Sequence, residues 1–221
     1  MKPIWQTGYS STHEEMFQRH FEPSFNEQGL AERFNLEIRS VPPSGEFGST
    51  AFNSMGRSAM QMILEFIQGR VGQVVVITGC DMRFYAPIAN EIFEEIPKAD
   101  FVSIWDFNQP VCGDFMGFVV SPKIFELYEL MVESDKDFPN QQYTLNWAVM
   151  TLGLKARILP RTYWTIGIGN GGVVWNSGQP VNPPRGIKLH HANFTVGVSN
   201  KMELLDRVYS MQKSGRCGVA S

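Results

Sequence analysis

The chain has 221 residues, of which 43% are hydrophobic and 19% are charged, with a formal net charge of -3. A chain of this length buries enough apolar surface for one well-cored domain. The slightly acidic balance gives no basic surface for nucleic acid, and no run reaches the roughly 18 apolar residues that a membrane span needs.

The first half of the chain alternates predicted strands and helices. Short apolar or alternating runs indicate strands, and three-to-four spacing of apolar residues indicates helices. The predicted elements are a strand at 4–7, a helix at 13–20, a strand at 34–38, a loop at 41–45, a helix capped by Asn53 or Ser54 and closed by Gly69, a strand at 74–78 and a helix at 86–96.

The second half continues the alternation, which predicts an α/β three-layer sandwich. Its first elements are a strand at 101–105, a polar loop at 106–114, a strand at 115–120, a helix capped by Ser121 before Pro122 and running to about Glu133, and a helix at 141–152, before which Pro139-Asn140 repeats the capping signal. They are followed by a strand at 156–159, a glycine- and proline-rich loop at 161–185, a strand at 187–191 and a helix at 201–211 opened by the capping-box pair Asn200 and Glu203. We expect one domain over 1–211 and a tail or linker at 212–221.

The most informative stretch is the run from Val74 to Thr78, which shows no polar alternation and is typical of a strand buried on both faces. It stops at Gly79, and a carboxylate follows at Asp81. In open α/β sheets, ligands bind beyond the carboxyl ends of the strands, because loops and helix N-termini converge there. We expect Asp81 to be an exposed loop carboxylate that holds a divalent cation and, through it, a diphosphate.

Two adjacent histidines, His190 and His191, end the last predicted strand. A carboxylate and an imidazole together suit Mn²⁺ or a similar cation, so Asp81, His190 and His191 form the candidate metal site. Adjacent strand residues face opposite ways, so only one of the histidines can face the site. The structural alternative is that Asp81 caps the following helix and one histidine packs inward.

Asn193 and Lys201 follow these histidines, near the start of the last predicted helix. A lysine at a helix N-terminus makes a positive site for phosphate oxygens, although a solvated surface lysine explains the pattern equally well. The glycine-rich stretch 167–172 could bring backbone N–H groups close to a ligand, or it could be a flexible turn.

Four further polar side chains lie near predicted strand or helix ends, where they could bind or deprotonate an acceptor hydroxyl, or serve as caps. These are Asp106, Asp114, Gln141 and Gln142.

Several other classes of protein are disfavoured. The dinucleotide-binding GxGxxG and the phosphate-binding GxxxxGK[ST] are absent. Cys80, Cys112 and Cys217 form no CxxC pair, which indicates neither a disulfide framework nor a structural zinc site. The N-terminus lacks the apolar region of a secretory signal, so we expect a soluble cytoplasmic protein.

The features that matter occur in a particular order: a first strand with Thr7 and Tyr9, a buried strand ending in a carboxylate, Gly117-Phe118 after a polar loop, a glutamine-rich helix start, and His-His-Ala-Asn before a lysine. This order resembles the nucleotide-diphospho-sugar glycosyltransferases of the GT-A fold, over residues from about 3 to 210. It is closest to soluble members, some of them encoded by large DNA viruses. The resemblance implies a GT-A-like three-layer α/β/α sandwich around a mostly parallel, mixed central sheet.

In that family the central strand ends in Asp-X-Asp, which holds Mn²⁺ or Mg²⁺ against the donor diphosphate. The matching triplet here is Gly79-Cys80-Asp81, and the residues that follow it align Asp81 with the second aspartate. The first aspartate is missing. A lone carboxylate leaves more of the coordination shell to His190 or His191, the diphosphate and water.

The resemblance also implies roles for residues outside the triplet. Asp114 and Gln142 are expected beside the transferred sugar and the acceptor, with Asp114 as the candidate base. The residues expected to bind the donor nucleotide are Thr7, Gly8, Tyr9, Arg57, Cys80, Asp81, Asn193 and Lys201.

The implied activity is metal-dependent transfer of a sugar from a nucleotide-diphosphate sugar, with a UDP-sugar as the expected donor, to a hydroxyl of a glycan or other acceptor. A cation and Lys201 would stabilise the charge that grows on the leaving diphosphate. Further domains of a longer chain are conceivable partners. The alternatives are a nucleotidyltransferase or sugar-nucleotide hydrolase, which usually cluster several carboxylates, and a non-catalytic carbohydrate-binding module, which the scattered tryptophans disfavour.

Overall fold

A computed structural model describes residues 2–41, 50–107 and 109–218. Its central sheet has six strands in the order β2-β1-β3-β6-β5-β7. They are β1 (Ile4–Tyr9), β2 (Asn35–Ser40), β3 (Val74–Gly79), β5 (Phe101–Ser103), β6 (Phe115–Val119) and β7 (Ala156–Ile158). Among these strands only β6 runs against the rest, because it pairs antiparallel with β3 and β5 while the other pairings are parallel. The expectation of a mostly parallel, mixed sheet is confirmed.

A second sheet of three strands, in the order β4-β9-β8, stands beside the central one. It consists of β4 (Met82–Phe84), β8 (Tyr163–Thr165) and β9 (Leu189–His191). Since β4 begins three residues after the end of β3 and pairs with β9, it brings the C-terminal third of the chain next to the end of the central strand.

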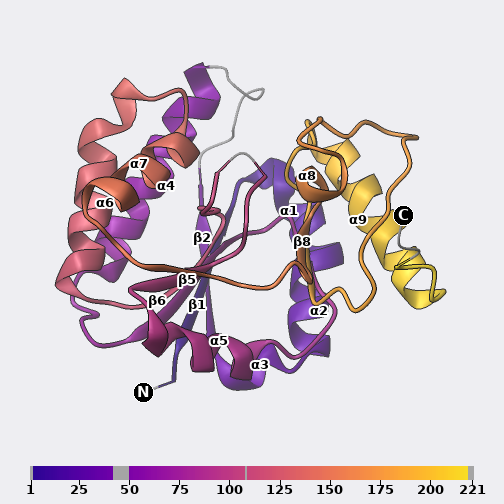
Figure 1. The fold of residues 1–221 in the computed structure, drawn as a ribbon, viewed down its shortest axis with the longest axis horizontal. Helices are drawn as coiled ribbons and strands as arrows, with labels where there is room; N and C mark the ends of the chain where they lie inside the picture. The colour runs from indigo at the N-terminus through magenta and orange to yellow at the C-terminus, as the bar shows by residue number, and fades with distance from the viewer. Residues whose placement is uncertain (1, 42–49, 108, 219–221) are drawn as a thin grey trace.

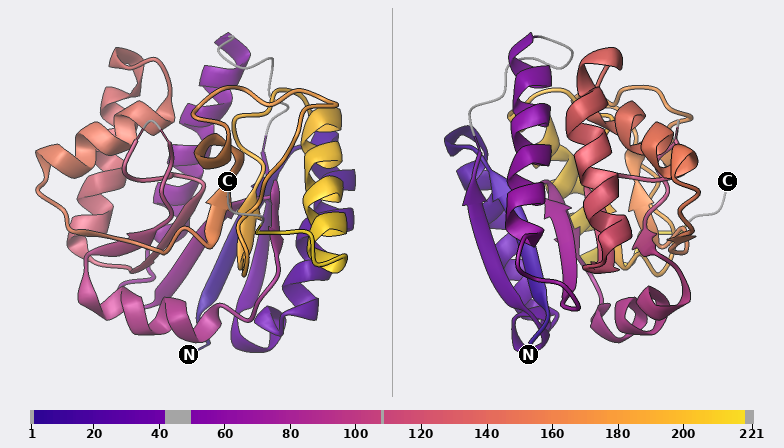
Figure 2. Two further views of the ribbon diagram at one scale, coloured as in Figure 1. Left: turned by 45° about the vertical axis from the view of Figure 1, so that its right-hand side comes forward. Right: turned by 90° about the vertical axis from the view of Figure 1, so that its left-hand side faces the viewer.

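Helices cover both faces of the central sheet (Figure 1). α4, α6 and α7 pack on one side, while α1, α2 and α9 lie on the other side with the small sheet; the two turned views in Figure 2 show the same layers. The helices are α1 (Glu14–Met16), α2 (Glu22–Glu27), α3 (Leu30–Arg33), α4 (Thr50–Ile67), α5 (Ala89–Glu95), α6 (Pro122–Ser134), α7 (Gln141–Thr151), α8 (Ile166–Gly169) and α9 (Val198–Lys213), with a π-helical turn at Phe17–Phe21 and 3₁₀ turns at Ser11–His13, Ile96–Lys98 and Asp135–Asp137. The expected three-layer α/β/α sandwich is therefore confirmed.

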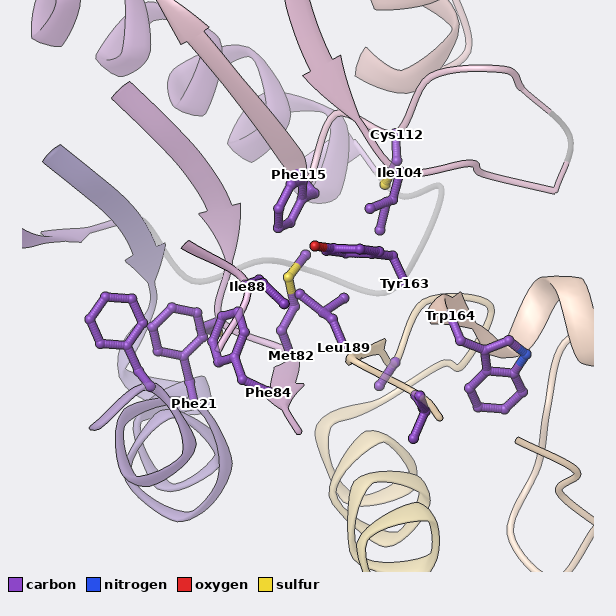
Figure 3. Close-up of a cluster of buried hydrophobic side chains, with 14 of the residues drawn as sticks. Phe21, Met82, Phe84, Ile88, Ile104, Cys112, Phe115, Tyr163, Trp164 and Leu189 are labelled. Atoms are coloured by element: carbon purple, nitrogen blue, oxygen red, sulfur yellow. The ribbon is translucent and has the colours of Figure 1, made fainter. Parts of the chain in front are cut away.

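The side chains of β3 alternate between two hydrophobic cores. Val75 and Ile77 pack in the core under α4, α6 and α7, whereas Val76 faces the core under α1, α2 and the small sheet. The alternation follows from the two-residue period of a strand, and it explains why the sequence of β3 is apolar without interruption. In the core under α1, α2 and the small sheet, Phe115 points toward Phe84 and other residues of the small sheet (Figure 3).

Most predicted elements occur within a few residues of their expected places. The two capping predictions at α6 and α7 hold in detail: Ser121 accepts a hydrogen bond from Ile124 N at 3.4 Å, and Asn140 accepts one from Gln142 N at 3.0 Å. Both helices begin where a polar side chain satisfies a free backbone N–H.

Other local predictions are wrong. The loop expected at 161–185 contains β8 and α8, and β4 was not expected; both strands are held by β9, a partner that local sequence does not reveal. The helix from Asn53 or Ser54 begins earlier, at Thr50. The loop predicted at 41–45 lies, apart from its first residue, outside the described residues.

The last helix also begins earlier than expected, at Val198 with Gly197 as its N-cap. The capping-box prediction is wrong, because Asn200 donates to Val196 O at 3.0 Å and Glu203 accepts from Gly178 N at 3.3 Å. After α9, Cys217 is buried and Gly218 N donates to Pro183 O at 3.0 Å.

Within the described ranges, no helix has the length and apolar character required to cross a lipid bilayer.

Candidate functional site

The sheet register brings three strand ends to one edge. Gly8, near the end of β1, pairs with Gly79 at the end of β3. On the other side of β3, Gly79 N donates to Asp114 O at 3.0 Å, just before β6 begins. Asp81 follows two residues after Gly79, so its side chain lies at the edge where ligands bind in open α/β sheets.

Asp81 is only 7% exposed, so the expectation of an exposed loop carboxylate is wrong. Its Oδ2 lies 2.5 Å from Lys201 Nζ, and its Oδ1 lies 3.3 Å from His191 Nε2. Its backbone oxygen accepts from Ala192 N at 2.9 Å, which ties the residue to the end of β9. Burial by itself raises the pKa of Asp81, but Lys201 and His191 outweigh it and hold the pKa well below its usual value.

Lys201 projects from the first turn of α9, and 23% of its side chain is exposed. Although burial lowers the pKa of Lys201, the neighbouring Asp81 carboxylate raises it above its usual value. The ammonium group therefore stays charged at neutral pH, at the positive end of a helix dipole.

His191 connects Asp81 to a second carboxylate. Its Nε2 lies 3.6 Å from Asp114 Oδ2, and its Nδ1 lies 3.8 Å from Cys112 Sγ. The ring is 1% exposed, and Nε2 makes no well-aligned hydrogen bond. Burial lowers the pKa of His191, but Asp81 and Cys112 raise it well above the usual value.

His190 faces the other side of β9, as strand alternation requires. Its ring packs against Trp164 with 4.9 Å between ring centroids, and neither ring nitrogen has a hydrogen-bond partner among the described residues. Burial lowers the pKa of His190 to about 3, so this imidazole is neutral. The structure thus brings one of the two histidines, His191, into contact with the Asp81 carboxylate.

Asp106 and Asn193 form a neighbouring polar pair. Asn193 Nδ2 donates to Asp106 Oδ1 at 3.0 Å, while Asn193 Oδ1 is buried and has no partner in the ranges that the structure describes. Burial, as the largest cause, raises the pKa of Asp106 to about 6, and the negative charge of Asp114 adds to the increase. An unpartnered amide oxygen next to a buried carboxyl group suits a ligand that brings a hydrogen-bond donor.

Gln142 does not present a free side chain. Its Oε1 accepts from Gly113 N at 2.9 Å, and its Nε2 donates to the backbone oxygen of Val111. Asn146, one turn later in α7, donates to the same oxygen at 3.0 Å. The start of α7 therefore fixes the loop that carries Asp114.

The residues expected to bind the nucleotide are spread more widely. Thr7 is 1% exposed, and its Oγ1 has no hydrogen-bond partner within the described ranges. Gly8 and Tyr9 are partly exposed, and the Tyr9 ring stacks on Phe17 with 4.6 Å between ring centroids. Arg57, on α4, pairs with Asp135 at 3.2 Å. Within the described part of the chain, it forms no ion pair with Asp81.

Cys80 is 5% exposed, and burial raises the pKa of its thiol. Only the backbone of this residue is therefore suited to contact a ligand. Sequence reasoning did not find Cys112 as a neighbour of His191, because the two are 79 positions apart and no local spacing signals their approach.

The donor set fits a divalent cation. The carboxylate oxygens of Asp81 and Asp114 lie 3.3 and 3.6 Å from the same imidazole nitrogen of His191, which makes no well-aligned hydrogen bond within the described part of the chain. Donors bound to one cation at about 2.1 Å lie about 3 Å apart when their bonds are at right angles. Potential ligand atoms of Cys112, Asp114 and His191 also lie within 4.8 Å of one another.

Comparisons with known proteins support the fold. No protein-family model matches the sequence, and no curated protein is similar to it. Among solved structures, a glycosyltransferase involved in the glycosylation of the major capsid of PBCV-1 superposes with a TM-score of 0.61 and 11% identity, over 93% of this chain and 100% of that chain. At this identity the likeness concerns the fold, which is the GT-A-like arrangement expected from the sequence.

Proposed function

We propose that the chain is a glycosyltransferase that takes its sugar from a nucleotide-diphosphate sugar, with a UDP-sugar as the donor. The observation that carries the proposal is the buried group of Asp81, His191 and Lys201 at the carboxyl edge of the central sheet. Opposite charges held in a largely water-excluded site interact more strongly than they do in bulk water. The fold shared with a glycosyltransferase supports this assignment.

Asp81 and His191 would hold Mn²⁺ or Mg²⁺, with Asp81 contributing Oδ1, because Oδ2 is paired with Lys201. When bound, the cation neutralises the diphosphate and stabilises the charge on the leaving nucleotide. Cys112 contacts the far nitrogen of the His191 ring, and this contact orients the ring toward the carboxylates.

Lys201 binds the diphosphate oxygens from the other side. Its ammonium group is held on Asp81 in the structure, and it stands in the first turn of α9, where backbone N–H groups also attract anions. A lysine fixed by a carboxylate needs little rearrangement to stabilise charge as the bond between sugar and diphosphate breaks.

The acceptor hydroxyl needs a base if the transfer inverts the sugar. The sequence suggested Asp114 for this role, but Asp114 lies beside His191 and the cation site. Asp106 suits the role better, because its carboxyl group has a pKa near 6 and Asn193 fixes its orientation. A base whose pKa is close to the working pH transfers protons most effectively.

A second candidate is a nucleotidyltransferase or sugar-nucleotide hydrolase. The specific observation in its favour is that three carboxylates, Asp81, Asp106 and Asp114, lie around His191, where the sequence suggested one. Enzymes that attack phosphorus often use such clusters to hold two cations. The two candidates break different bonds of the same donor and are separated by their products.

The test is to incubate the protein with UDP- and GDP-sugars, with and without Mn²⁺, and to follow the products by phosphorus NMR. A glycosyltransferase releases the nucleoside diphosphate, at a slow rate when water replaces the acceptor. A pyrophosphate-cleaving enzyme releases the nucleoside monophosphate and a sugar phosphate. Release of monophosphate, or of nothing across the panel of donors, contradicts the proposal; Asp81→Asn is the inactive control.

A further inference from the structure

The end of β3 and the start of β6 are neighbours across an antiparallel pair. The register pairs Thr78 with Phe115, and Gly79 N donates to Asp114 O at 3.0 Å, so residues 79 and 114 stand opposite each other. Opposite residues of an antiparallel pair direct their side chains to the same face, about 5 Å apart. A side chain at position 79 would also share this face with Asp81, two residues further on.

The place of that side chain is occupied. A Cβ atom built on Gly79 meets Asp81 Oδ1 at 2.8 Å and the Cβ and Cγ atoms of Asp114 at 3.6 and 3.7 Å. Gly79 is not among the glycines with positive φ, so its backbone does not require glycine. The close contact is therefore with the end of the Asp81 side chain, while Asp114 lies at ordinary van der Waals distance from the same space.

A buried imidazole nitrogen that makes no well-aligned hydrogen bond within the described residues lies between the two carboxylates. His191 Nε2 lies 3.3 Å from Asp81 Oδ1 and 3.6 Å from Asp114 Oδ2, and it makes no well-aligned hydrogen bond to any of the described residues although the residue is 1% exposed. The Asp114 side chain is 47% exposed, so the group is open toward solvent on that side. Two carboxylate oxygens and one imidazole nitrogen make a donor set for a divalent cation of the Mn²⁺ type.

We propose that Asp114 supplies the second carboxylate of the cation site, from the strand opposite the triplet Gly79-Cys80-Asp81. The carboxylate that the triplet lacks at position 79 is contributed by position 114, whose Cβ and Cγ atoms lie 3.6 and 3.7 Å from the place of a Cβ atom at position 79. The proposal rests on the proposed function, in which Asp81 and His191 bind the cation of the donor diphosphate. It assigns Asp114 to cation binding and leaves proton transfer to Asp106.

The experiment removes the carboxylate at position 114 and introduces one at position 79, on the opposite strand. Mn²⁺ binding without nucleotide is measured from the electron paramagnetic resonance signal of free Mn²⁺, for the wild type, Asp114→Asn, Asp114→Gly and the double variant Gly79→Asp/Asp114→Gly. We expect both single variants to bind Mn²⁺ at least about tenfold more weakly, the size of effect known for groups around a metal. The double variant should recover to within a few-fold of the wild type, because a carboxylate introduced at position 79 reaches the same space once the flexible end of Asp81, 2.8 Å from the new Cβ atom, shifts aside.

Asp137→Asn is the matched control, since it makes the same chemical change on an exposed turn away from the site. The proposal is overturned if Asp114→Asn binds Mn²⁺ as the wild type does, if the folded double variant shows no recovery, or if the wild type takes up no Mn²⁺ even with UDP present. Asp114→Asn keeps the shape of the side chain, so it remains informative if the glycine variants fail to fold.

The two proposals can fail separately. If Mn²⁺ binding follows the expected order but no nucleoside diphosphate is released from any sugar nucleotide, the assignment of Asp114 stands and the glycosyltransferase proposal fails.

Discussion

The two sides of β9 carry the same side chain in opposite surroundings. His191 faces Asp81, Asp114 and Cys112, and these neighbours raise its pKa well above the usual value. His190, one residue earlier, faces Trp164, and burial lowers its pKa to about 3. The residue type does not decide whether a buried histidine serves packing or chemistry; the charges brought in by other elements decide it.

The two histidines also differ in how their surroundings contribute to the stability of the fold. On the His191 side, charged groups are buried and stabilise one another's charges. Removing one of them therefore leaves a buried charge without its counter-charge. On the His190 side, a neutral ring without hydrogen bonds is stable as long as it stays neutral. The predictions below act on one side or the other.

The largest effect is expected from Asp81→Asn. Loss of the carboxylate leaves Lys201 and His191 largely buried without their main partner, so we expect the free energy of unfolding to fall by about 4 kcal/mol. Urea unfolding at neutral pH measures the loss. Adding Lys201→Met should restore at least half of it, because the unpaired ammonium group is then absent. Equal stability of Asp81→Asn and the wild type would show that the ion pair does not form.

His20 extends the comparison to another buried imidazole. It is 2% exposed, and neither ring nitrogen has a hydrogen-bond partner among the residues that the structure describes. Burial lowers its pKa to about 4 despite the Asp206 carboxylate at 3.6 Å. The unfolded chain takes up this proton near pH 6.5 and the folded protein only near pH 4, so stability falls as the pH drops through that window. The loss amounts to as much as about 3 kcal/mol.

The variant His20→Phe should reduce this acid loss, and thermal unfolding from pH 7 to pH 4 measures it. The matched substitution Phe21→Leu, one residue further along the same turn, should lower stability about equally at all these pH values, because it removes no titratable group. A wild type and a His20→Phe variant with parallel pH profiles would rule out the role given to His20.

The contribution of Asp106 to folding stability depends on pH in the opposite direction from that of His20. Its pKa is raised from 3.8 to about 6, so the folded protein binds the proton more tightly than the unfolded chain. The stability from this group is complete below pH 3.8 and is lost as the pH rises through 6. Asp106→Asn should therefore stabilise the protein at pH 7.5, by as much as about 3 kcal/mol, and hardly at all at pH 4. Chemical denaturation at the two pH values checks this, and a pH-independent effect would contradict it.

The smallest effect, and the most specific, separates the two histidines themselves. We expect His191→Gln to weaken Mn²⁺ binding about tenfold or more, because it removes the nitrogen between the carboxylates. His190→Phe should leave Mn²⁺ binding unchanged, since its ring packs against Trp164. Calorimetry with both purified variants measures the difference. Equal losses in both variants would mean that packing of β9, and not ligation by His191, controls the site.

Local sequence was enough for part of the fold. The apolar run of β3 and the caps Ser121 and Asn140 identified the central strand and two helices, because these signals depend on neighbouring residues. β4 and β8 were missed, since their pairing with β9 joins segments far apart in the chain.

Local sequence also predicts the candidate site only in part. Asp81 and the two histidines could be found from strand ends and residue type, but the burial of Asp81 could not, because it depends on Lys201, 120 positions away. The place of Asp114 opposite Gly79 follows from the antiparallel register of β3 and β6, which no local pattern reveals.

The side of β9 that carries His191 is proposed to bind a diphosphate through a cation and Lys201. Calorimetric titration of UDP and of uridine into the wild type and Lys201→Met, each with and without Mn²⁺, tests it most directly. We predict that Mn²⁺ tightens UDP binding to the wild type, and that Lys201→Met weakens UDP binding about tenfold or more while leaving uridine binding unchanged. Equal losses for UDP and uridine, or UDP binding that ignores Mn²⁺, would contradict the account.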